Sequence, residues 1–258
     1  MKKTALVTGA SSGIGLELAR ECASNGHDLV VVARRQDRLH DFAETIFNDF
    51  DVKVNVIVMD LSTDGSRKNL FDQIESQGIE IDYLINNAGF GDYGPFVDSD
   101  LNRQIEMINL NVIALTELTR LFLPSMVNRG QGAILNVAST AAFQAGPMMS
   151  VYFATKAFVL HFSEAVANEV HATGVRVVAL CPGTTESEFA NTAQAERSLM
   201  FNMRKLPTSK QVARYGYLSM VKGKRVAVHG LLNKVLTFFV RLVPRRVVTA
   251  IARKMTAD

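Results

Sequence analysis

Short apolar runs alternate with amphipathic stretches along most of the chain. The apolar runs, rich in β-branched residues, predict strands at residues 4–9, 28–33, 52–59, 82–88, 132–139, 175–182 and 225–230. Because these runs are continuous, both faces of each strand should be covered, as they are in a parallel sheet. Helical patterns lie between the runs, which predicts right-handed crossovers and an α/β fold with one doubly wound parallel sheet.

Two segments stand apart from this alternation. Residues 184–221 are largely polar, helical in composition and mixed with apolar side chains such as Phe201, which predicts a mobile helical lid within a domain spanning residues 1–230. Residues 231–258 predict a C-terminal extension of two basic amphipathic helices, separated at Pro244. Lys234 and Arg241 interrupt the apolar run, so it does not reach the ~20 residues that a bilayer span needs. These helices could lie on a membrane surface, cover a cleft or pack against a second subunit; we favour the last two interpretations.

The composition sets limits on the function. At 258 residues and 48% hydrophobic content, the chain can form one large domain with a substantial core. A net charge of +3 does not favour a nucleic-acid partner. Cys22 and Cys181 are too few and too scattered for a disulfide framework or a zinc site, so buried free thiols and no metal are expected. The opening "MKKTALVTGA" has no export pattern, which predicts a cytoplasmic protein.

A glycine-rich loop, "VTGASSGIG" at residues 7–15, joins the first predicted strand to the first helix. Gly9 permits a tight turn, Gly13 lets backbone amides approach a pyrophosphate, and Gly15 lets the helix pack close to the sheet. The N-terminus of the helix adds partial positive charge. The same spacing could form an ordinary strand-to-helix turn, but its position favours a dinucleotide site in a Rossmann-type domain.

The second strand ends in "ARRQ", where an NAD-binding site would have an acidic residue. Arg34 and Arg35 instead present two guanidinium groups, which suit a 2′-phosphate and favour NADP(H). If the arginines are solvated and paired with Asp37 or Asp41, an NAD-linked alcohol oxidase becomes the alternative. Asp60 could accept a hydrogen bond from an adenine amino group, although a capping residue would look the same.

With the glycine loop, "NNAG" at 86–89, Ser139, Tyr152-x-x-x-Lys156 and "PGTT" at 182–185 in this order, the chain resembles the short-chain dehydrogenase/reductase family from about residue 4 to residue 189. The resemblance implies a catalytic set of Asn111, Ser139, Tyr152 and Lys156. Asn111 matches the family position better than Asn109, counting back from "LPSM" at 123–126.

The predicted cofactor site joins the residues of the loop argument with those that the resemblance implies. Its members are Gly9, Ser11, Ser12, Gly13, Ile14, Gly15, Arg34, Arg35, Asp60, Leu61, Asn87, Ala88, Gly89, Tyr152, Lys156, Pro182, Gly183, Thr184 and Thr185. Many relatives have a Thr where this chain has Glu186 or Ser187, so the backbone contacts of that loop are better supported than its side-chain contacts.

The four catalytic residues predict carbonyl reduction. A phenol has a pKa of about 10, and poising it near 7 requires ~4 kcal/mol of preference for its anion. One ammonium about 4 Å away supplies on the order of that energy at an effective dielectric of 20. We therefore expect Lys156 to lower the pKa of Tyr152, which donates a proton to the carbonyl oxygen while Ser139 hydrogen-bonds that oxygen. By resemblance, Lys156 also binds the nicotinamide ribose, and Asn111 positions a proton path.

The expected substrate is a lipophilic ketone or a 3-oxoacyl compound, because apolar residues surround the predicted cleft. These are Phe90, Tyr93, Phe96, Phe143, Met148, Met149, Phe189 and Met203. A non-catalytic nucleotide-binding scaffold and a peripheral membrane module are the alternatives. Two helices are apolar around much of their circumference, and in the family such helices form dimer interfaces, so a homodimer or homotetramer is expected.

Overall fold

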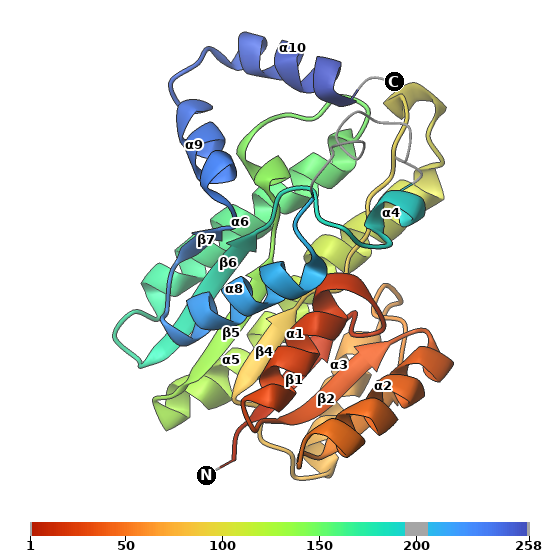
Figure 1. Cartoon of the computed structure of the whole chain (residues 1–258), viewed down its shortest axis with the longest axis vertical. Helices are drawn as coiled ribbons and strands as arrows, with labels where there is room; N and C mark the ends of the chain where they lie inside the picture. The colour runs from red at the N-terminus through yellow and green to blue at the C-terminus, as the bar shows by residue number, and fades with distance from the viewer. Residues whose placement is uncertain (1, 194–205, 257–258) are drawn as a thin grey trace.

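The computed structural model describes residues 2–193 and 206–256, which contain a seven-stranded parallel sheet in the order β3-β2-β1-β4-β5-β6-β7 (Figure 1). The strands are β1 (Thr4–Thr8), β2 (Asp28–Ala33), β3 (Val54–Val58), β4 (Tyr83–Asn86), β5 (Gly132–Val137), β6 (Val175–Cys181) and β7 (Val226–Val228). The strand order reverses between β1 and β4. At such a switch point the loops on either side diverge and leave a crevice at the carboxyl ends of the strands.

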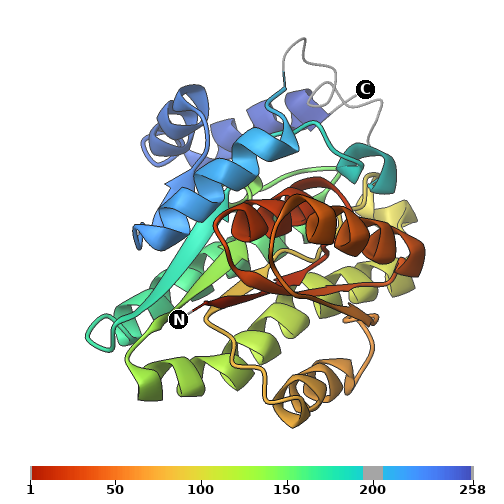
Figure 2. The ribbon, with the colours of Figure 1, turned by 60° about the horizontal axis from the view of Figure 1, so that its bottom comes forward.

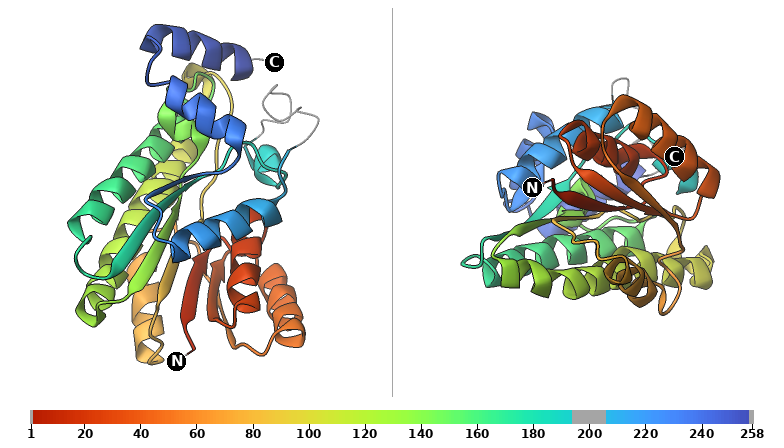
Figure 3. Two further views of the ribbon diagram at one scale, coloured as in Figure 1. Left: turned by 60° about the vertical axis from the view of Figure 1, so that its left-hand side comes forward. Right: turned by 90° about the horizontal axis from the view of Figure 1, so that it is seen from below.

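Helices cover both faces of the sheet, as Figures 2 and 3 show. One layer contains α1 (Gly13–Ser24), α2 (Gln36–Asp49) and α8 (Ser209–Val221), and the other contains α3 (Ser66–Ser76), α5 (Leu115–Arg129) and α6 (Ser150–Glu169). Successive residues of β1 point to opposite layers: Ala5 and Val7 join the first core, and Leu6 joins the second. This double burial explains why the strand sequences are continuously apolar, and it confirms the doubly wound α/β prediction.

The strands are shorter than their apolar runs at the carboxyl end. The predicted runs 82–88 and 132–139 end in the sheet at Asn86 and Val137, because the following residues leave the ladder and enter the loops of the crevice. One of these loops leads into the short helix η3 (Thr140–Phe143). These are the residues that the sequence marks as functional.

The predicted lid over residues 184–221 is corrected in its last part. Besides the one-turn helix α7 (Phe189–Thr192), this region contains α8, whose Val212, Tyr217 and Met220 are buried in the core beside α1. An apolar face of this kind fixes α8 in the helical layer, so it is not part of a mobile cover. Residues 194–205 of the predicted lid, including Phe201 and Met203, lie outside the described residues.

A long helical stretch begins with α4 (Leu101–Ile108), passes through a π-helical turn, η2 (Asn109–Ala114), and continues as α5. In the ranges 2–193 and 206–256, it is the one stretch long and apolar enough to cross a membrane by length and composition. Leu118, Phe122 and Met126 of α5 are buried against the sheet, however. A helix that packs in a core passes the same test, so this is weak evidence for a membrane span.

The C-terminal extension contains α9 (Leu231–Phe239) and α10 (Arg245–Thr256). Both lie at the end of the molecule opposite the N-terminus, beyond the carboxyl ends of the strands (Figure 1). With 9 and 12 residues, neither helix reaches the ~20 residues of a membrane span.

Candidate functional site

The predicted site residues come together around one cavity of about 390 Å³ at the carboxyl ends of the strands. Every predicted catalytic and cofactor-binding residue lines this cavity except Asn111. The residues come from the loops after β1, β2, β3, β4, β5 and β6, and from the first turns of α6. The cavity therefore crosses the switch point between β1 and β4, where an elongated ligand can contact both halves of the sheet.

The glycine loop and the loop after β4 approach each other closely. A Cβ atom at Gly9 would lie 2.9 Å from Ala88 Cα, and one at Gly15 would lie 2.2 Å from Asn87 Nδ2. Gly9 also has a φ of +68°, which favours glycine. The Asn87 side chain donates to Thr8 O at 3.0 Å, and Thr8 Oγ1 accepts from Asn87 N and Ala88 N. These contacts hold the N-terminus of α1 open toward the cavity, a geometry that fits a pyrophosphate.

Arg35 is held over the glycine loop by serine hydroxyls. Its Nη2 lies 3.0 Å from Ser11 Oγ and 2.6 Å from Ser12 Oγ, and its Nε lies 3.1 Å from Ser11 Oγ. Its Nη1 lies 2.8 Å from a carboxylate oxygen of Glu188, on the loop after β6. A guanidinium and two hydroxyls thus converge at the end of the cavity next to the glycine loop, and all three can donate to a phosphate.

Arg34 also lines the cavity and is more than half exposed, but its partners differ from those of Arg35. Its Nη1 lies 3.4 Å from Asp60 Oδ2 and 3.2 Å from Glu106 Oε1. The pairing residues expected from the sequence, Asp37 and Asp41, are therefore not its partners. Burial opposes ionisation of Asp60, but hydrogen bonds from Ser62 and the charge of Arg34 outweigh it and lower the pKa of Asp60.

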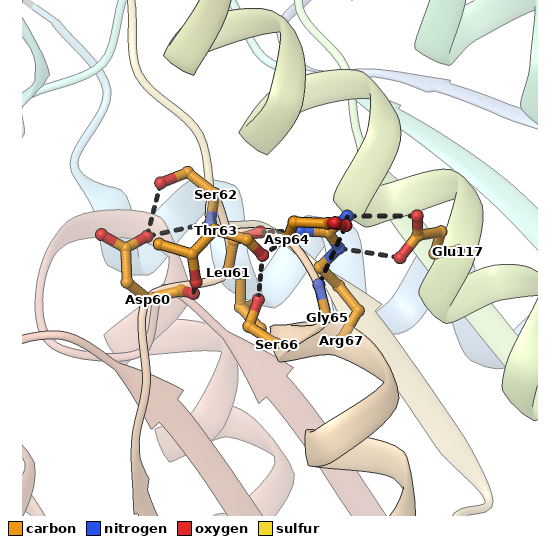
Figure 4. Close-up of polar contacts among 9 residues, drawn as sticks. All are labelled: Asp60, Leu61, Ser62, Thr63, Asp64, Gly65, Ser66, Arg67 and Glu117. Carbon is orange, nitrogen blue, oxygen red and sulfur yellow. Dashed lines mark hydrogen bonds and ion pairs between the residues drawn. The ribbon is translucent and has the colours of Figure 1, made fainter.

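The loop that follows Asp60 is braced by a buried arginine (Figure 4). Asp60 Oδ1 accepts from Ser62 N and Ser62 Oγ, and Leu61 lines the cavity. Arg67 on α3 donates to Thr63 O and forms two hydrogen bonds with Glu117 on α5, at 2.8 and 3.1 Å. Its side chain is only 4% exposed. The loop conformation at the adenine end therefore depends on an ion pair outside the cavity, which the sequence analysis does not identify.

Tyr152 and Ser139 form the polar centre of the other half of the cavity. Ser139 caps the N-terminus of η3, where its Oγ accepts from Ala141 N at 3.0 Å, and Tyr152 stands in the first turn of α6. Burial raises the pKa of Tyr152 to about 12, and the neighbouring Ser139 side chain only partly opposes this.

Lys156 lies one helical turn after Tyr152 and is buried. Its Nζ donates to Val137 O at 2.8 Å and lies 5.8 Å from the centre of the Tyr152 ring. Burial lowers the pKa of Lys156 to about 8. The expectation that Lys156 brings the phenol pKa down toward 7 is wrong for the protein's own groups, because the ammonium faces the ring and burial dominates.

Asn111 lies behind the cavity wall, within the π-helical turn η2. Its Nδ2 donates to Phe90 O and to Thr155 Oγ1, and its Oδ1 accepts from Phe90 N at 3.1 Å. A Cβ atom at Gly89 would lie 2.7 Å from Asn111 Oδ1 and 3.6 Å from Lys156 Nζ. The hydrogen bonds from Asn111 to Phe90 therefore hold the loop after β4 close to Lys156. Its role in a proton path stays a prediction.

The loop after β6 completes the cavity with Pro182, Gly183, Thr184 and Thr185. Thr140 N donates to Pro182 O, and Thr185 Oγ1 donates to Gly183 O at 2.9 Å. Ser187, which departs from the family pattern, caps α7 by accepting from Phe189 N. Glu188, which the sequence analysis does not single out, pairs with both Arg35 and Arg38. These hydrogen bonds from Arg38 and Arg35 lower its pKa to about 2.

The substrate end of the cavity is apolar near Tyr152. Phe90, Met149 and Phe189 line it, and the Phe189 ring lies 5.1 Å from that of Tyr152, centre to centre. Phe153 and Gln144 also line the cavity, and neither was expected from the sequence. Gln144 follows the predicted catalytic strand by only a few residues, which is the signal that could have identified it. Of the other expected residues, Tyr93, Phe96, Phe143 and Met148 lie outside the cavity lining, and Met203 lies outside the described residues.

In the described part of the chain, no cluster of three or more His, Cys, Asp and Glu side chains could hold a metal ion. Cys22 and Cys181 are both buried and unbonded, and burial raises the pKa of Cys181 to about 12. Tyr152, Ser139 and Lys156 place a phenol, a hydroxyl and an ammonium in the cavity lining.

Comparison with known proteins identifies relatives. Residues 3–198 match the protein-family model described as short chain dehydrogenase. A short chain dehydrogenase of Pseudocercospora fijiensis is 37% identical over 221 residues, which cover 82% of this chain and 71% of the relative. The very-long-chain 3-oxoacyl-CoA reductase of Rattus norvegicus is 38% identical over 184 residues, 69% of this chain and 58% of that enzyme. The match thus spans little more than half of the reductase.

A solved structure agrees over almost the whole chain. A short-chain dehydrogenase from Sphingobium yanoikuyae, solved in complex with NADPH, superposes with a TM-score of 0.83 and 30% sequence identity, covering 94% of this chain and 97% of that one.

Proposed function

The chain belongs to the short-chain dehydrogenase family of oxidoreductases, and from this premise we propose that it reduces a lipophilic ketone to an alcohol with NADPH. The observation that carries the proposal is the convergence of Ser139, Tyr152 and Lys156 on the cavity that Arg35 and the glycine loop close at its other end. A redox cofactor and a carbonyl group both need to lie in such a cavity, with their reacting ends beside the phenol.

The preference for NADPH is supported by the groups around Arg35. Arg35, Ser11 and Ser12 gather donors at the adenosine end, where NADP carries a 2′-phosphate that NAD lacks. No acidic residue occupies the end of β2, since this strand is followed by Arg34 and Arg35. The similar structure from Sphingobium yanoikuyae contains NADPH, which agrees with this assignment.

When bound, NADPH supplies a hydride to the carbonyl carbon. Tyr152 donates its hydroxyl proton to the carbonyl oxygen, so that the C=O group becomes CH–OH. Ser139, which lines the same cavity as Tyr152, holds the same oxygen in place. The phenol left as an anion is stabilised by the charge of Lys156, whose ammonium Val137 O positions. Asn111 keeps the loop after β4 against this group.

The substrate class is a ketone that carries a long apolar chain, such as a 3-oxoacyl thioester. Phe90, Met149 and Phe189 provide an apolar surface beside Tyr152, and Gln144 adds a polar group to the cavity lining. The rat relative is named for the reduction of very-long-chain 3-oxoacyl-CoA, which supports this choice among lipophilic ketones.

The test is NADPH oxidation by the full chain with 3-oxoacyl-CoA esters of increasing chain length, compared with short ketones, steroids and sugars. We expect the kcat/KM to increase with chain length, because each added buried CH₂ contributes ~0.8 kcal/mol. Tyr152→Phe should abolish turnover and leave NADPH binding largely intact. Turnover of the variant near the wild-type rate would contradict the proposed mechanism, and a preference for sugars would contradict the substrate class.

We also infer a homo-oligomer formed through the face of α4, η2 and α6. Ile105, Ile113 and Phe158 are exposed there, and Phe158 stacks on Phe162 with ring centres 5.7 Å apart. Analytical ultracentrifugation tests this, and Ile113→Glu together with Phe158→Glu should yield a monomer.

A further inference from the structure

The helix α9 directs Asn233 and Thr237 inward and most of its apolar residues outward. Thr237 is the buried side chain of this helix, and Asn233 is half-buried with its Nδ2 donating to His229 O. Leu231, Leu232 and Phe238 are 78%, 63% and 59% exposed. This is the reverse of the arrangement expected for a helix that packs against a protein core.

The helix α10 continues the same surface. It buries Ala252 and Thr256, while Val247 and Ile251, which are one helical turn apart, are each about half exposed. We call the exposed side chains of residues 231–254 the C-terminal face.

The C-terminal face carries only positive charge. The sequence from 231 to 256 contains six lysines and arginines and no Asp or Glu: Lys234, Arg241, Arg245, Arg246, Arg253 and Lys254. None of them forms an ion pair within residues 2–193 and 206–256. Lys234 contacts the Tyr215 ring, 5.7 Å from its centre.

Both ends of this segment are attached to the loops of the catalytic cavity. At its start, Asn233 lies against Gly183, where an added Cβ would be 2.5 Å from Asn233 Nδ2. At its end, the Tyr93 hydroxyl donates to Thr256 O at 2.7 Å. Figure 3 shows α9 and α10 at the end of the molecule where the strands end, opposite the N-terminus. The face therefore borders the side of the molecule on which the cavity lies.

We propose that the C-terminal face binds the surface of a membrane that contains anionic lipids, with the helices lying in the interface. Exposed Leu, Val and Phe side chains together with exposed cations are what an interfacial helix needs, because the former enter the acyl boundary and the latter meet lipid phosphates. A second copy of the chain is a poorer partner, since a twofold contact would bring this cationic face against itself.

The test is flotation of the full-length chain with vesicles of phosphatidylcholine alone and with vesicles that also contain phosphatidylglycerol, at low and high salt. We expect binding to the anionic vesicles that weakens with salt. Arg245→Glu with Arg246→Glu should weaken binding to the anionic vesicles at least about 30-fold, because each cation near an anionic surface contributes substantially to the binding free energy. Phe238→Ser with Phe239→Ser should abolish it. Both pairs are exposed, so circular dichroism and the melting temperature should be unchanged.

The matched control is Lys53→Glu with Lys222→Glu, which changes the net charge equally at exposed positions near the amino ends of the strands. This control should bind vesicles like the wild type. The proposal is overturned if the wild type does not float with anionic vesicles, or if the control loses binding as strongly as the arginine variant. It is also overturned if the Phe variant still binds vesicles and differs from the wild type only in changing from an oligomer to a monomer. Vesicle binding is measured without turnover, so its outcome is independent of the proposed reductase activity.

Discussion

The ammonium of Lys156 faces the ring of Tyr152, 5.8 Å from its centre, and donates its hydrogen bond to Val137 O. Both groups are buried. Burial raises the pKa of the phenol to about 12 and lowers that of the ammonium to about 8. At neutral pH the pair consists of a protonated phenol beside a cation. This is the state needed to donate a proton to a carbonyl oxygen and then stabilise the phenolate.

The first prediction concerns the pH dependence of reduction. Below pH 8 Lys156 is charged and can stabilise the phenolate that forms on Tyr152, and above pH 8 this charge is lost. We expect kcat for ketone reduction to be constant from pH 6 to 7.5 and to fall by about tenfold per unit well above pH 8. Lys156→Arg keeps its charge throughout this range, so its kcat should be lower but without the decrease near pH 8. The same decrease in the Arg variant would show that another group titrates.

The second prediction concerns cofactor choice. Arg35 contacts Ser11, Ser12 and Glu188, whereas Arg34 is directed toward Asp60 and Glu106. Loss of hydrogen bonds from a charged donor costs about 1.5–3 kcal/mol, so Arg35→Ala should raise the KM for NADPH about 10- to 100-fold. The KM for NADH should change little. Steady-state kinetics with both cofactors measures this. Equal losses for NADH and NADPH would contradict a role in recognising the 2′-phosphate.

Much of the architecture could be predicted because it depends on local pattern. Continuous apolar strands can only be covered on both faces, and a parallel sheet then brings the loops after β1, β4 and β5 to one end. Residues as distant as Gly9, Asn87 and Tyr152 line one cavity for this reason. Asn111 is buried behind this cavity because the π-helical turn directs its side chain to Phe90.

The remaining features depend on long-range contacts that leave little trace in the sequence. The Arg67–Glu117 pair joins helices fifty residues apart, and Arg67 looks like an ordinary surface residue of α3 until its burial is known. Spacing places Lys156 on the same helix face as Tyr152, but it shows neither the burial that raises the pKa of the phenol nor which part of the ring the ammonium faces. The α8 segment resembles a polar lid by composition, yet a few spaced apolar residues suffice to bury it beside α1.

The third prediction concerns the brace of the adenine-side loop. Arg67→Met removes one donor to Thr63 O, which keeps its bond from Ser66, and removes the ion-pair partner of Glu117, so the free energy of unfolding should fall by about 2–3 kcal/mol. The loop with Asp60 and Leu61 should loosen, and NADPH binding should weaken although Arg67 does not line the cavity. Thermal denaturation and NADPH titration measure both effects. Lys68→Met, at the next and exposed position of α3, is the control and should change neither.

The fourth prediction concerns the carboxylate that pairs with the arginines. Glu188 contacts Arg35 and Arg38, and its pKa of about 2 keeps it ionised at every assay pH. A 2′-phosphate that binds Arg35 has to compete with this carboxylate for the same donors. Because both partners are nearly half exposed, the competition should be modest.

Glu188→Gln retains the shape of the side chain but removes its charge, so the Kd for NADPH should decrease by up to about fivefold while the Kd for NADH stays constant. Glu186→Gln, two residues earlier on the same loop, removes an equal charge and should leave both values unchanged. Fluorescence titration of the three proteins with each cofactor distinguishes the effects. A weaker affinity of Glu188→Gln for NADPH would mean that Glu188 orients Arg35 for the phosphate and does not compete with it.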